Sequence, residues 1–179
     1  MKALDFLKTF VADYKVGALT VTSPYAARKI ARGVKPGMKY IVEYGAGEGV
    51  ITREILKHFP ADGKILTFEL NKRLIAEFKG KVNDHRVSIQ QEDILHVVNR
   101  LSSLGVPRID CVVSGIPLTF FDARQRERIV QKTHEALVPG GRFIVYQYTI
   151  WALPLLKKYF KKVRLSYEIR NLFPYLIMV

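Results

Sequence analysis

The chain has 179 residues, 49% apolar and 25% charged, with one cysteine, so it can bury a core without a structural metal and cannot contain an internal disulfide. Its net charge of +13 lies at the two ends: residues 1–39 carry eight basic and two acidic side chains, residues 151–179 six and one, and residues 40–150 fifteen and thirteen. Such clustered charge predicts a polyanionic partner, either nucleic acid or an anionic membrane surface.

Two helices are predicted ahead of the first strand. Apolar residues recur at steps of three and four through residues 1–14, which predicts an amphipathic helix that either docks on the protein core or lies in a membrane interface. Ser23 and Pro24 have the character of an N-cap and a first helical residue, so residues 23–33 form a helix that Gly33 ends. No uncharged apolar stretch reaches the ~20 residues that cross a bilayer, and the N-terminus does not read as a signal peptide. A cytoplasmic location is therefore expected.

Short, nearly all-apolar segments alternate with helix-like segments from residue 40 onward. This pattern is typical of a parallel sheet with helices on both faces. The predicted strands are Tyr40–Tyr44, Lys64–Glu69, Arg86–Gln90, Ile109–Ser114, Arg142–Gln147, Val163–Ile169 and Tyr175–Val179. The predicted helices between them are 50–58, 71–79, 93–101 and 122–137. With no linker or repeat, residues 1–179 are predicted to be one α/β domain with its catalytic core in 40–179.

A glycine-rich loop joins the first strand to the next helix. It reads Glu43-Tyr44-Gly45-Ala46-Gly47-Glu48-Gly49, and its glycines allow a tight turn that approaches a ligand beside the free N–H groups of a helix N-terminus. A dinucleotide-binding loop would place its third glycine at Val50. The spacing instead resembles motif I of the S-adenosylmethionine-dependent methyltransferases, in which Glu43 helps to hold the methionine end of the cofactor.

Acidic residues after the next two strands fit the same family. Glu69 lies 20 residues beyond Gly49, where a carboxylate accepts hydrogen bonds from ribose hydroxyls, and Leu70 would pack on the adenine. Asp93 matches the family position that contacts the adenine amino group, and we favour it over its neighbour Glu92. Asp93 is equally interpretable as a helix N-cap. The cofactor-binding residues implied by the resemblance are Glu43, Tyr44, Gly45, Ala46, Gly47, Gly49, Glu69, Leu70, Asp93, Ile94 and Ser114.

The fourth strand ends in the segment Ser114-Gly115-Ile116-Pro117-Leu118. In amino-group methyltransferases this segment holds the acceptor nitrogen, and those acting on adenine have an aromatic residue where this chain has Leu118. Together with Gly141–Tyr148 and Arg170–Pro174, the segment resembles the bacterial phospholipid N-methyltransferases over nearly the whole chain. The resemblance implies a Rossmann-like class I methyltransferase fold: a seven-stranded, mostly parallel sheet with an antiparallel last strand and helices on both faces.

The same resemblance implies a function and a location. The expected reaction is S-adenosylmethionine-dependent N-methylation of phosphatidylethanolamine toward phosphatidylcholine, with S-adenosylhomocysteine as product. The protein would be a monomer associated peripherally with the inner face of an anionic membrane, and residues 1–14 would contact that membrane because the enzyme needs a device to reach a lipid acceptor.

The acceptor site is assigned from the same comparison. We expect Ser114, Gly115, Ile116 and Pro117 to orient the amine. Three tyrosines are candidates to line the pocket and to offer π-faces to the ammonium that forms: Tyr25, Tyr146 and Tyr148. Arg170 and Asn171 would hold the lipid phosphate. Core packing is the other interpretation of the tyrosines, and a solvated turn that of Arg170. No general base is evident, and the four histidines are scattered singly, so no metal is expected.

Three alternatives stay open. One is an RNA adenine N6-methyltransferase, which suits the basic charge but neither Ser114 nor Leu118. A second is N-methylation of another amino lipid, such as an ornithine lipid. A third is a binding module without activity, which the intact loop and acidic positions disfavour.

Overall fold

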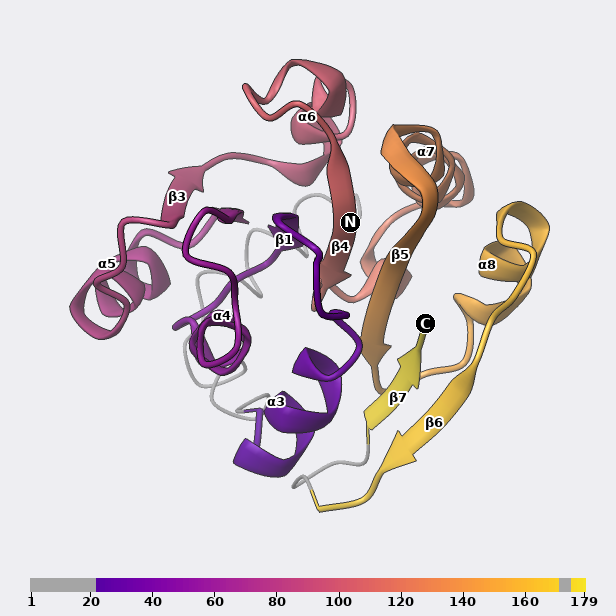
Figure 1. The fold of residues 1–179 in the computed structure, drawn as a ribbon. Helices are drawn as coiled ribbons and strands as arrows, with labels where there is room; N and C mark the ends of the chain where they lie inside the picture. The colour runs from indigo at the N-terminus through magenta and orange to yellow at the C-terminus, as the bar shows by residue number, and fades with distance from the viewer. Residues whose placement is uncertain (1–21, 171–174) are drawn as a thin grey trace.

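The computed structural model describes residues 22–170 and 175–179. The elements of this part, in chain order, are α3 (Pro24–Ala31), β1 (Tyr40–Tyr44), α4 (Val50–Leu56), β2 (Lys64–Glu69), α5 (Lys72–Lys81), β3 (Val87–Gln91), α6 (Ile94–Val97), η1 (Leu101–Ser103), β4 (Ile109–Ser114), η2 (Leu118–Phe120), α7 (Ala123–Ala136), β5 (Leu137–Gln147), α8 (Leu153–Tyr159), β6 (Leu165–Glu168) and β7 (Tyr175–Met178) (Figure 1). The predicted helix at 1–14 and Asn171 lie outside the described residues.

The described strands form one seven-stranded sheet in the order β3-β2-β1-β4-β5-β7-β6. The pairs from β3 to β5 are parallel, and β7 is antiparallel to both of its neighbours. This confirms the predicted class I methyltransferase fold, including the antiparallel last strand. The periodicity of the sequence alone does not give the order of the strands. Among the described residues, no helix is long and apolar enough to span a membrane.

The sheet lies between helices (Figure 1), and an apolar cluster packs on each of its faces. Buried side chains of α3 and α4 pack with one face of β1, β4 and β5, and those of α6, α7 and α8 pack with the other. All six residues of β4 are buried, as expected of a central strand covered on both faces. The edge strand β3 alternates partly buried and exposed residues at its start.

Two predicted elements differ from the structure by four residues or more at one end. The helix predicted at 93–101 is shorter: α6 ends at Val97, and a separate 3₁₀ turn follows at Leu101–Ser103. The fifth strand is longer: β5 begins at Leu137, which pairs with Ile109 before an irregularity shifts the register. The Pro139-Gly140-Gly141 segment, which precedes the predicted strand at Arg142–Gln147, therefore lies within β5.

The sheet has a topological switch point at its centre. The chain leaves β1 toward α4 on one face, while it leaves the adjacent β4 toward α7 on the other face. A crevice outside the carboxyl ends of the strands at such a point is the usual ligand site of open α/β sheets. The glycine loop follows β1 and the Ser114 segment follows β4, so the fold places both predicted halves of the site there.

Candidate functional site

The glycine loop turns sharply between β1 and α4. Gly45, Gly47 and Gly49 have φ values of 73°, 55° and 83°, which favour glycine because a Cβ crowds the backbone there. At Gly49 a Cβ would lie 2.6 Å from Cγ2 of Val82 and 2.9 Å from Cδ2 of Phe78, whereas at Gly47 it would meet nothing within 4 Å. Gly49 thus serves the packing of the loop on its neighbours and can reach a cofactor only through its backbone, and Gly47 keeps an open side for a ligand.

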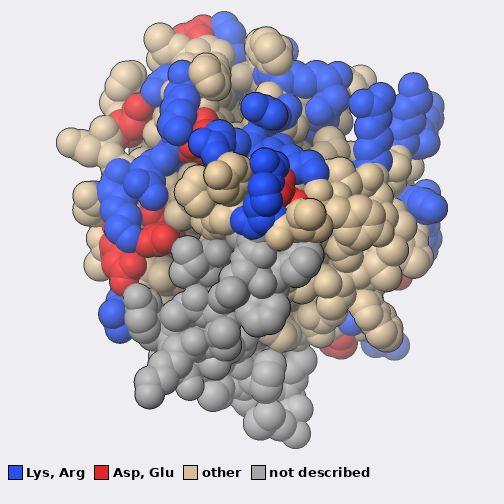
Figure 2. Space-filling view, turned by 90° about the horizontal axis from the view of Figure 1, so that it is seen from below, with Lys and Arg blue, Asp and Glu red and all other residues tan. Residues whose placement is uncertain are grey.

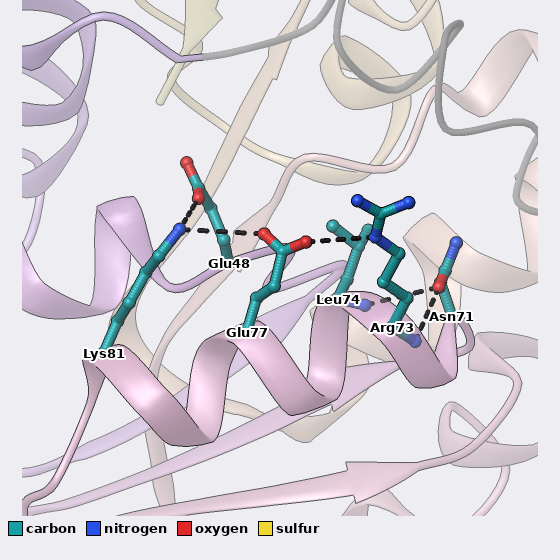
Figure 3. Close-up of polar contacts among 6 residues, drawn as sticks. All are labelled: Glu48, Asn71, Arg73, Leu74, Glu77 and Lys81. Atoms are coloured by element: carbon teal, nitrogen blue, oxygen red, sulfur yellow. Dashed lines mark hydrogen bonds and ion pairs between the residues drawn. The ribbon is translucent and has the colours of Figure 1, made fainter.

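Charged side chains tie the same loop to α5 (Figure 3). Glu48 accepts a hydrogen bond from Lys81, and Nζ of Lys81 also lies 3.7 Å from Oε2 of Glu77. Glu77 continues the network to Arg73, and Asn71 caps the helix by accepting from the backbone N–H groups of Arg73 and Leu74. The loop is therefore held on a capped helix through Glu48, and this residue is not available to the crevice.

Glu69 closes the far side of the loop from the end of β2. Its Oε2 accepts from the backbone N–H of Gly47 at 3.0 Å, and its Oε1 accepts from those of Leu70 and Asn71 at 2.8 and 3.0 Å. The side chain is 9% exposed. A carboxylate fixed by three N–H groups beside the loop is preorganised to accept hydrogen bonds from ligand hydroxyls as well.

Glu43 is the buried carboxyl of the site. It lies on β1 and is fully buried; Oε2 accepts from Oγ1 of Thr52 at 2.5 Å, while Oε1 has no hydrogen-bond partner within the described residues. Burial, with a smaller contribution from the nearby Glu69 carboxylate, raises the pKa of Glu43 to about 8 against the lowering effect of the Thr52 hydrogen bond. A buried carboxyl oxygen without a partner fits a cationic ligand group, because such a group would satisfy it.

The predicted adenine contacts lie next along the edge. Asp93 is the N-cap of α6, where its Oδ1 accepts from the backbone N–H of Leu95 at 2.8 Å. Glu92 is bound by Arg100 instead, which leaves Asp93 as the better candidate of the two. Leu70 is partly buried and packs against the apolar cluster that contains Ile94. Both interpretations of Asp93 are thus compatible, since a capping carboxylate keeps a second oxygen.

The segment after β4 lies directly beside the glycine loop. The backbone N–H of Gly115 donates to the carbonyl oxygen of Tyr44 at 3.0 Å, and a Cβ at Gly45 would lie 3.0 Å from Cγ2 of Ile116. The fully buried Ser114 has a hydroxyl without a hydrogen-bond partner in the described structure. Like Oε1 of Glu43, this atom is free for a ligand. Pro117 follows in extended conformation.

Tyr44 has its side chain turned away from this region. Its side chain is fully buried, its hydroxyl lies 3.1 Å from Oγ1 of Thr133, and its ring packs edge-on against Phe143. The side chain therefore belongs to the core, and only the backbone of Tyr44 can serve the cofactor site.

A cluster of tyrosines occupies the neighbouring end of β5 and β7. Tyr146 lies near the end of β5 and Tyr148 directly after it, and both rings contact that of Tyr175, with centroids 5.5 Å and 4.6 Å apart. The Tyr148 hydroxyl donates to that of Tyr175 at 3.0 Å. A Cβ at Gly115 would lie 2.2 Å from the hydroxyl of Tyr146, so this hydroxyl lies against the Ser114 segment. Burial, with nearby Glu43, raises the pKa of Tyr146 well above its ordinary value.

Tyr25 lies with two arginines beside this cluster. The guanidinium carbons of Arg170 and Arg28 lie 4.6 Å and 5.0 Å from the centroid of the Tyr25 ring. Arg170, predicted to hold a phosphate, is already bound by both oxygens of the buried Glu168, at 2.8 and 2.9 Å; this pair lowers the pKa of Glu168 to about 2. Arg28, which has no carboxylate partner among the described residues, is the better anion-binding candidate.

The structure thus brings most of the predicted site residues to the edge of the sheet where β1, β2 and β4 end. It also places further residues there. Tyr175, Thr52 and Gln147 are absent from the sequence-based assignment. Gln147 is buried at the end of β5: Oε1 accepts from the backbone N–H of Leu118 at 3.3 Å, and Nε2 has no partner in the described residues. Tyr175 could have been found, because an antiparallel last strand beside β5 places its first residue near Tyr148.

The residues fit S-adenosylmethionine at the carboxyl ends of β1, β2 and β4. The unpartnered oxygen of Glu43 suits an ammonium, the fixed carboxylate of Glu69 suits ribose hydroxyls, and the open side of Gly47 leaves space for a ligand. Within residues 22–170 and 175–179, no group of three or more His, Cys, Asp or Glu side chains could hold a metal ion.

Comparisons with known proteins agree with this geometry. Residues 41–141 match the family model described as a methyltransferase domain. The ornithine lipid N-methyltransferase of Singulisphaera acidiphila is 26% identical over 173 residues, which cover 93% of this chain and 88% of that protein.

Solved structures share the fold. The N-methyltransferase NodS from Bradyrhizobium japonicum WM9, in complex with S-adenosyl-l-homocysteine, superposes with a TM-score of 0.67 at 12% identity, covering 99% of this chain and 97% of that one. The precorrin-6y C5,15-methyltransferase from Geobacter metallireducens GS-15 gives 0.59 at 15% identity, covering 87% and 84%. At these identities the likeness shows the fold alone.

Proposed function

The chain belongs to the methyltransferase domain family and uses S-adenosylmethionine, and from this premise we propose that it methylates the amino group of a membrane amino lipid, with an ornithine lipid ahead of phosphatidylethanolamine. The observation that carries the proposal is the tyrosine cluster formed by Tyr146, Tyr148 and Tyr175 next to the Ser114 segment. Methyl transfer from the sulfonium to a neutral amine moves the positive charge from sulfur to the acceptor nitrogen. Aromatic faces stabilise such a cation.

The cofactor half of the site has a defined task for each side chain. Bound there, S-adenosylmethionine supplies an electrophilic methyl group on a sulfonium. Glu43 would accept from its ammonium, Glu69 from its ribose hydroxyls, and Asp93 from its adenine amino group. Catalysis then depends mainly on positioning the acceptor nitrogen in line with the methyl group.

The acceptor half supplies orientation and a place for positive charge. The Ser114 hydroxyl and the side-chain amide of Gln147 are buried and have atoms without hydrogen-bond partners in the described structure, so they can bind polar atoms of the acceptor. The Tyr146 hydroxyl stays protonated because its pKa is raised; it can exchange hydrogen bonds with the amine but does not act as a base. The amine therefore has to arrive neutral or lose its proton to water.

The choice of lipid rests on two further observations. The similarity to the ornithine lipid N-methyltransferase extends over 93% of this chain, and the arginine expected to bind a lipid phosphate, Arg170, is neutralised by Glu168. Ornithine is an amino acid with a side-chain amine, so a lipid built on it offers the required nucleophile. Phosphatidylethanolamine, expected from the sequence, remains the second acceptor to test.

The nucleic-acid alternative has weaker support from the geometry. Leu118 stands where adenine methyltransferases have an aromatic residue, and it is 1% exposed, so it offers no stacking face for a base. The basic ends of the chain keep RNA in the experiment as a competing acceptor.

We further propose a cytoplasmic enzyme associated peripherally with the inner face of the membrane. Its support is the positive charge of residues 1–39 and 151–179 and the amphipathic pattern of residues 1–14.

One assay tests the proposed function. Purified protein is incubated with methyl-labelled S-adenosylmethionine and, in parallel, with ornithine lipid, phosphatidylethanolamine or total RNA, the lipids in detergent micelles. We expect label in the ornithine lipid, with the product mass increased by whole methyl groups. Label in phosphatidylethanolamine alone would correct the lipid, and label in RNA alone would overturn the proposal. The Glu43→Gln variant serves as the matched control for cofactor-dependent transfer.

A further inference from the structure

The exposed large hydrophobic side chains of the described residues gather at one edge of the molecule. They form a set that we call the rim: Tyr25, Tyr148, Ile150, Trp151, Tyr167 and Ile169. Trp151 and Ile169 are the most exposed, at 73% and 75%. Exposed apolar side chains scattered singly need no explanation, but a set confined to one place marks an interaction site.

The sheet topology explains why these residues share an edge. Tyr148, Ile150 and Trp151 follow the end of β5, and Ile169 follows the end of β6. β7 lies between these two strands and runs opposite to both, with its first residues paired to the ends of each. With strands spaced about 4.8 Å apart, the two ends are about 10 Å from one another. Tyr25 joins them through the Arg170 guanidinium stacked on its ring.

The two segments that carry the rim are strongly positive. Residues 22–39 and 147–170 contain eleven Lys and Arg but a single acidic residue, Glu168. Glu168 is 2% exposed and bound by Arg170. In the view from below the fold of Figure 1, Lys and Arg gather beside a continuous uncharged area (Figure 2). Two of these cations pair with carboxylates of other segments, Lys39 with Asp62 and Lys158 with Glu127, so the rim combines apolar protrusions with a surround whose net charge is positive.

This chemistry matches an anionic bilayer better than a nucleic acid. Trp and Tyr prefer the headgroup level of membranes, and basic side chains gain from anionic lipids next to it. Ile150 and Ile169 have no π-face on which a base could stack, whereas aliphatic side chains suit the acyl boundary. The tyrosine cluster that we assign to the acceptor opens beside the rim, since Tyr148 belongs to both.

We propose that the rim is a membrane-contacting surface, separate from residues 1–14, which inserts Ile150, Trp151 and Ile169 at the headgroup–acyl boundary of an anionic bilayer and brings the acceptor site to the lipid headgroups. The proposal rests on the proposed function, because it supposes that the acceptor is a lipid. In this proposal the rim gives the acceptor site access to the lipid substrate, in addition to attaching the protein to the membrane.

The only tryptophan of the chain provides the test. Trp151 emission is recorded with phosphatidylglycerol-containing vesicles, with phosphatidylcholine vesicles, and with vesicles whose acyl chains are brominated. We expect a shift to shorter wavelength and quenching by bromine, both stronger with the anionic vesicles. The matched control is the double variant Trp151→Phe with His85→Trp, since His85 is 85% exposed in the turn before β3, at the opposite end of the strands. Its emission should not respond.

A second variant separates this surface from the reaction. Ile150→Ser combined with Trp151→Ser should weaken vesicle binding about tenfold or more, because each side chain loses burial in lipid. Methylation of the acceptor in vesicles should fall by a similar factor, while methylation of the same acceptor in detergent micelles and binding of S-adenosylhomocysteine should not change.

The outcomes distinguish the two proposals. If no lipid is methylated in micelles, the proposed function fails, and Trp151 fluorescence still decides whether the rim inserts. If Trp151 is not quenched although the protein binds vesicles, the rim proposal is overturned. It is also overturned if Trp151 responds instead to RNA or to increasing protein concentration, which would assign the rim to nucleic acid or to a second copy of the chain.

Discussion

The two halves of the site's edge are built in opposite ways. The cofactor half comes mainly from one stretch of the chain, between Glu43 and Asp93, and its carboxylates are held by backbone N–H groups or buried. The acceptor half is assembled from α3, the Ser114 segment, the end of β5 and the β6–β7 hairpin, and it exposes aromatic rings and basic groups. The first half is fixed before any ligand arrives, whereas the second lies open. Substrate choice therefore belongs to the second half.

The largest effect is expected from the glycine that packs the fixed half. Gly49→Ala should lower the free energy of unfolding by about 2–5 kcal/mol, because the left-handed φ costs about 1–2 kcal/mol and the clash with Val82 and Phe78 adds an overpacking cost of about 1–3 kcal/mol. Urea unfolding measures this. Gly47→Ala is the matched control and should cost only about 1–2 kcal/mol, since its Cβ meets nothing. Equal losses in the two variants would refute a packing role for Gly49.

The next effect concerns pH and the buried carboxyl. With its pKa raised to about 8, Glu43 holds a proton in the free protein at neutral pH, and a cationic ligand group has to displace it. Affinity for S-adenosylmethionine should therefore rise as pH increases from about 6 to 8 and level off above. Glu43→Gln should bind about tenfold more weakly at pH 8, consistent with the loss of a charge-assisted hydrogen bond, and show no such rise. A pH dependence that survives in the variant would exclude Glu43 as its source.

A substitution in the acceptor half should change the affinity for the acceptor and leave that for the cofactor as it is. Tyr148→Ala should raise the KM for the amino lipid in micelles about tenfold, because a cation–π contact contributes about 1–2 kcal/mol when partly desolvated. The Kd of S-adenosylhomocysteine should stay as it is. Tyr167→Ala removes a tyrosine from the rim but not from the cluster, so in micelles it should leave KM unchanged. An altered cofactor affinity in Tyr148→Ala would mean that the two halves are not separable.

The smallest effect is expected at the surface charge. Arg28→Gln should raise the acceptor KM by about two- to threefold at low salt, and the difference should vanish at high salt because exposed charges are screened. Arg32→Gln, one turn further along, lacks the contact to Tyr25 and serves as the control. A salt-independent effect would indicate that Arg28 acts through packing.

The same division explains how much could be predicted from the sequence. The strands, the glycine loop, Glu43 and Glu69 follow from local signals: apolar runs, glycine spacing and a fixed distance along the chain. The role of Tyr175 and the Glu168–Arg170 pair depend on which strands become neighbours at the far edge, which periodicity does not encode. The pairing of β7 with β5 decides both.

Two residues of the glycine motif also have packing roles. Tyr44 sits within the glycine motif, but strand alternation turns its side chain to the core, where it meets Thr133. Gly49 also belongs to the motif, yet its missing side chain is required by Phe78 and Val82. The motif predicts the conformation of the loop backbone, but it does not distinguish residues that contact a ligand from residues that hold the loop.

Calorimetric titration of S-adenosylhomocysteine into the purified protein tests the central claim, that the loop at 45–49 and Glu69 form one nucleoside site. We predict binding of one ligand per chain and, in Glu69→Ala, an affinity lower by about 100-fold, from the loss of charge-assisted hydrogen bonds. Heat absent from the unmodified protein, or equal affinity in a Glu69→Ala variant shown to be folded by urea unfolding, would contradict the account.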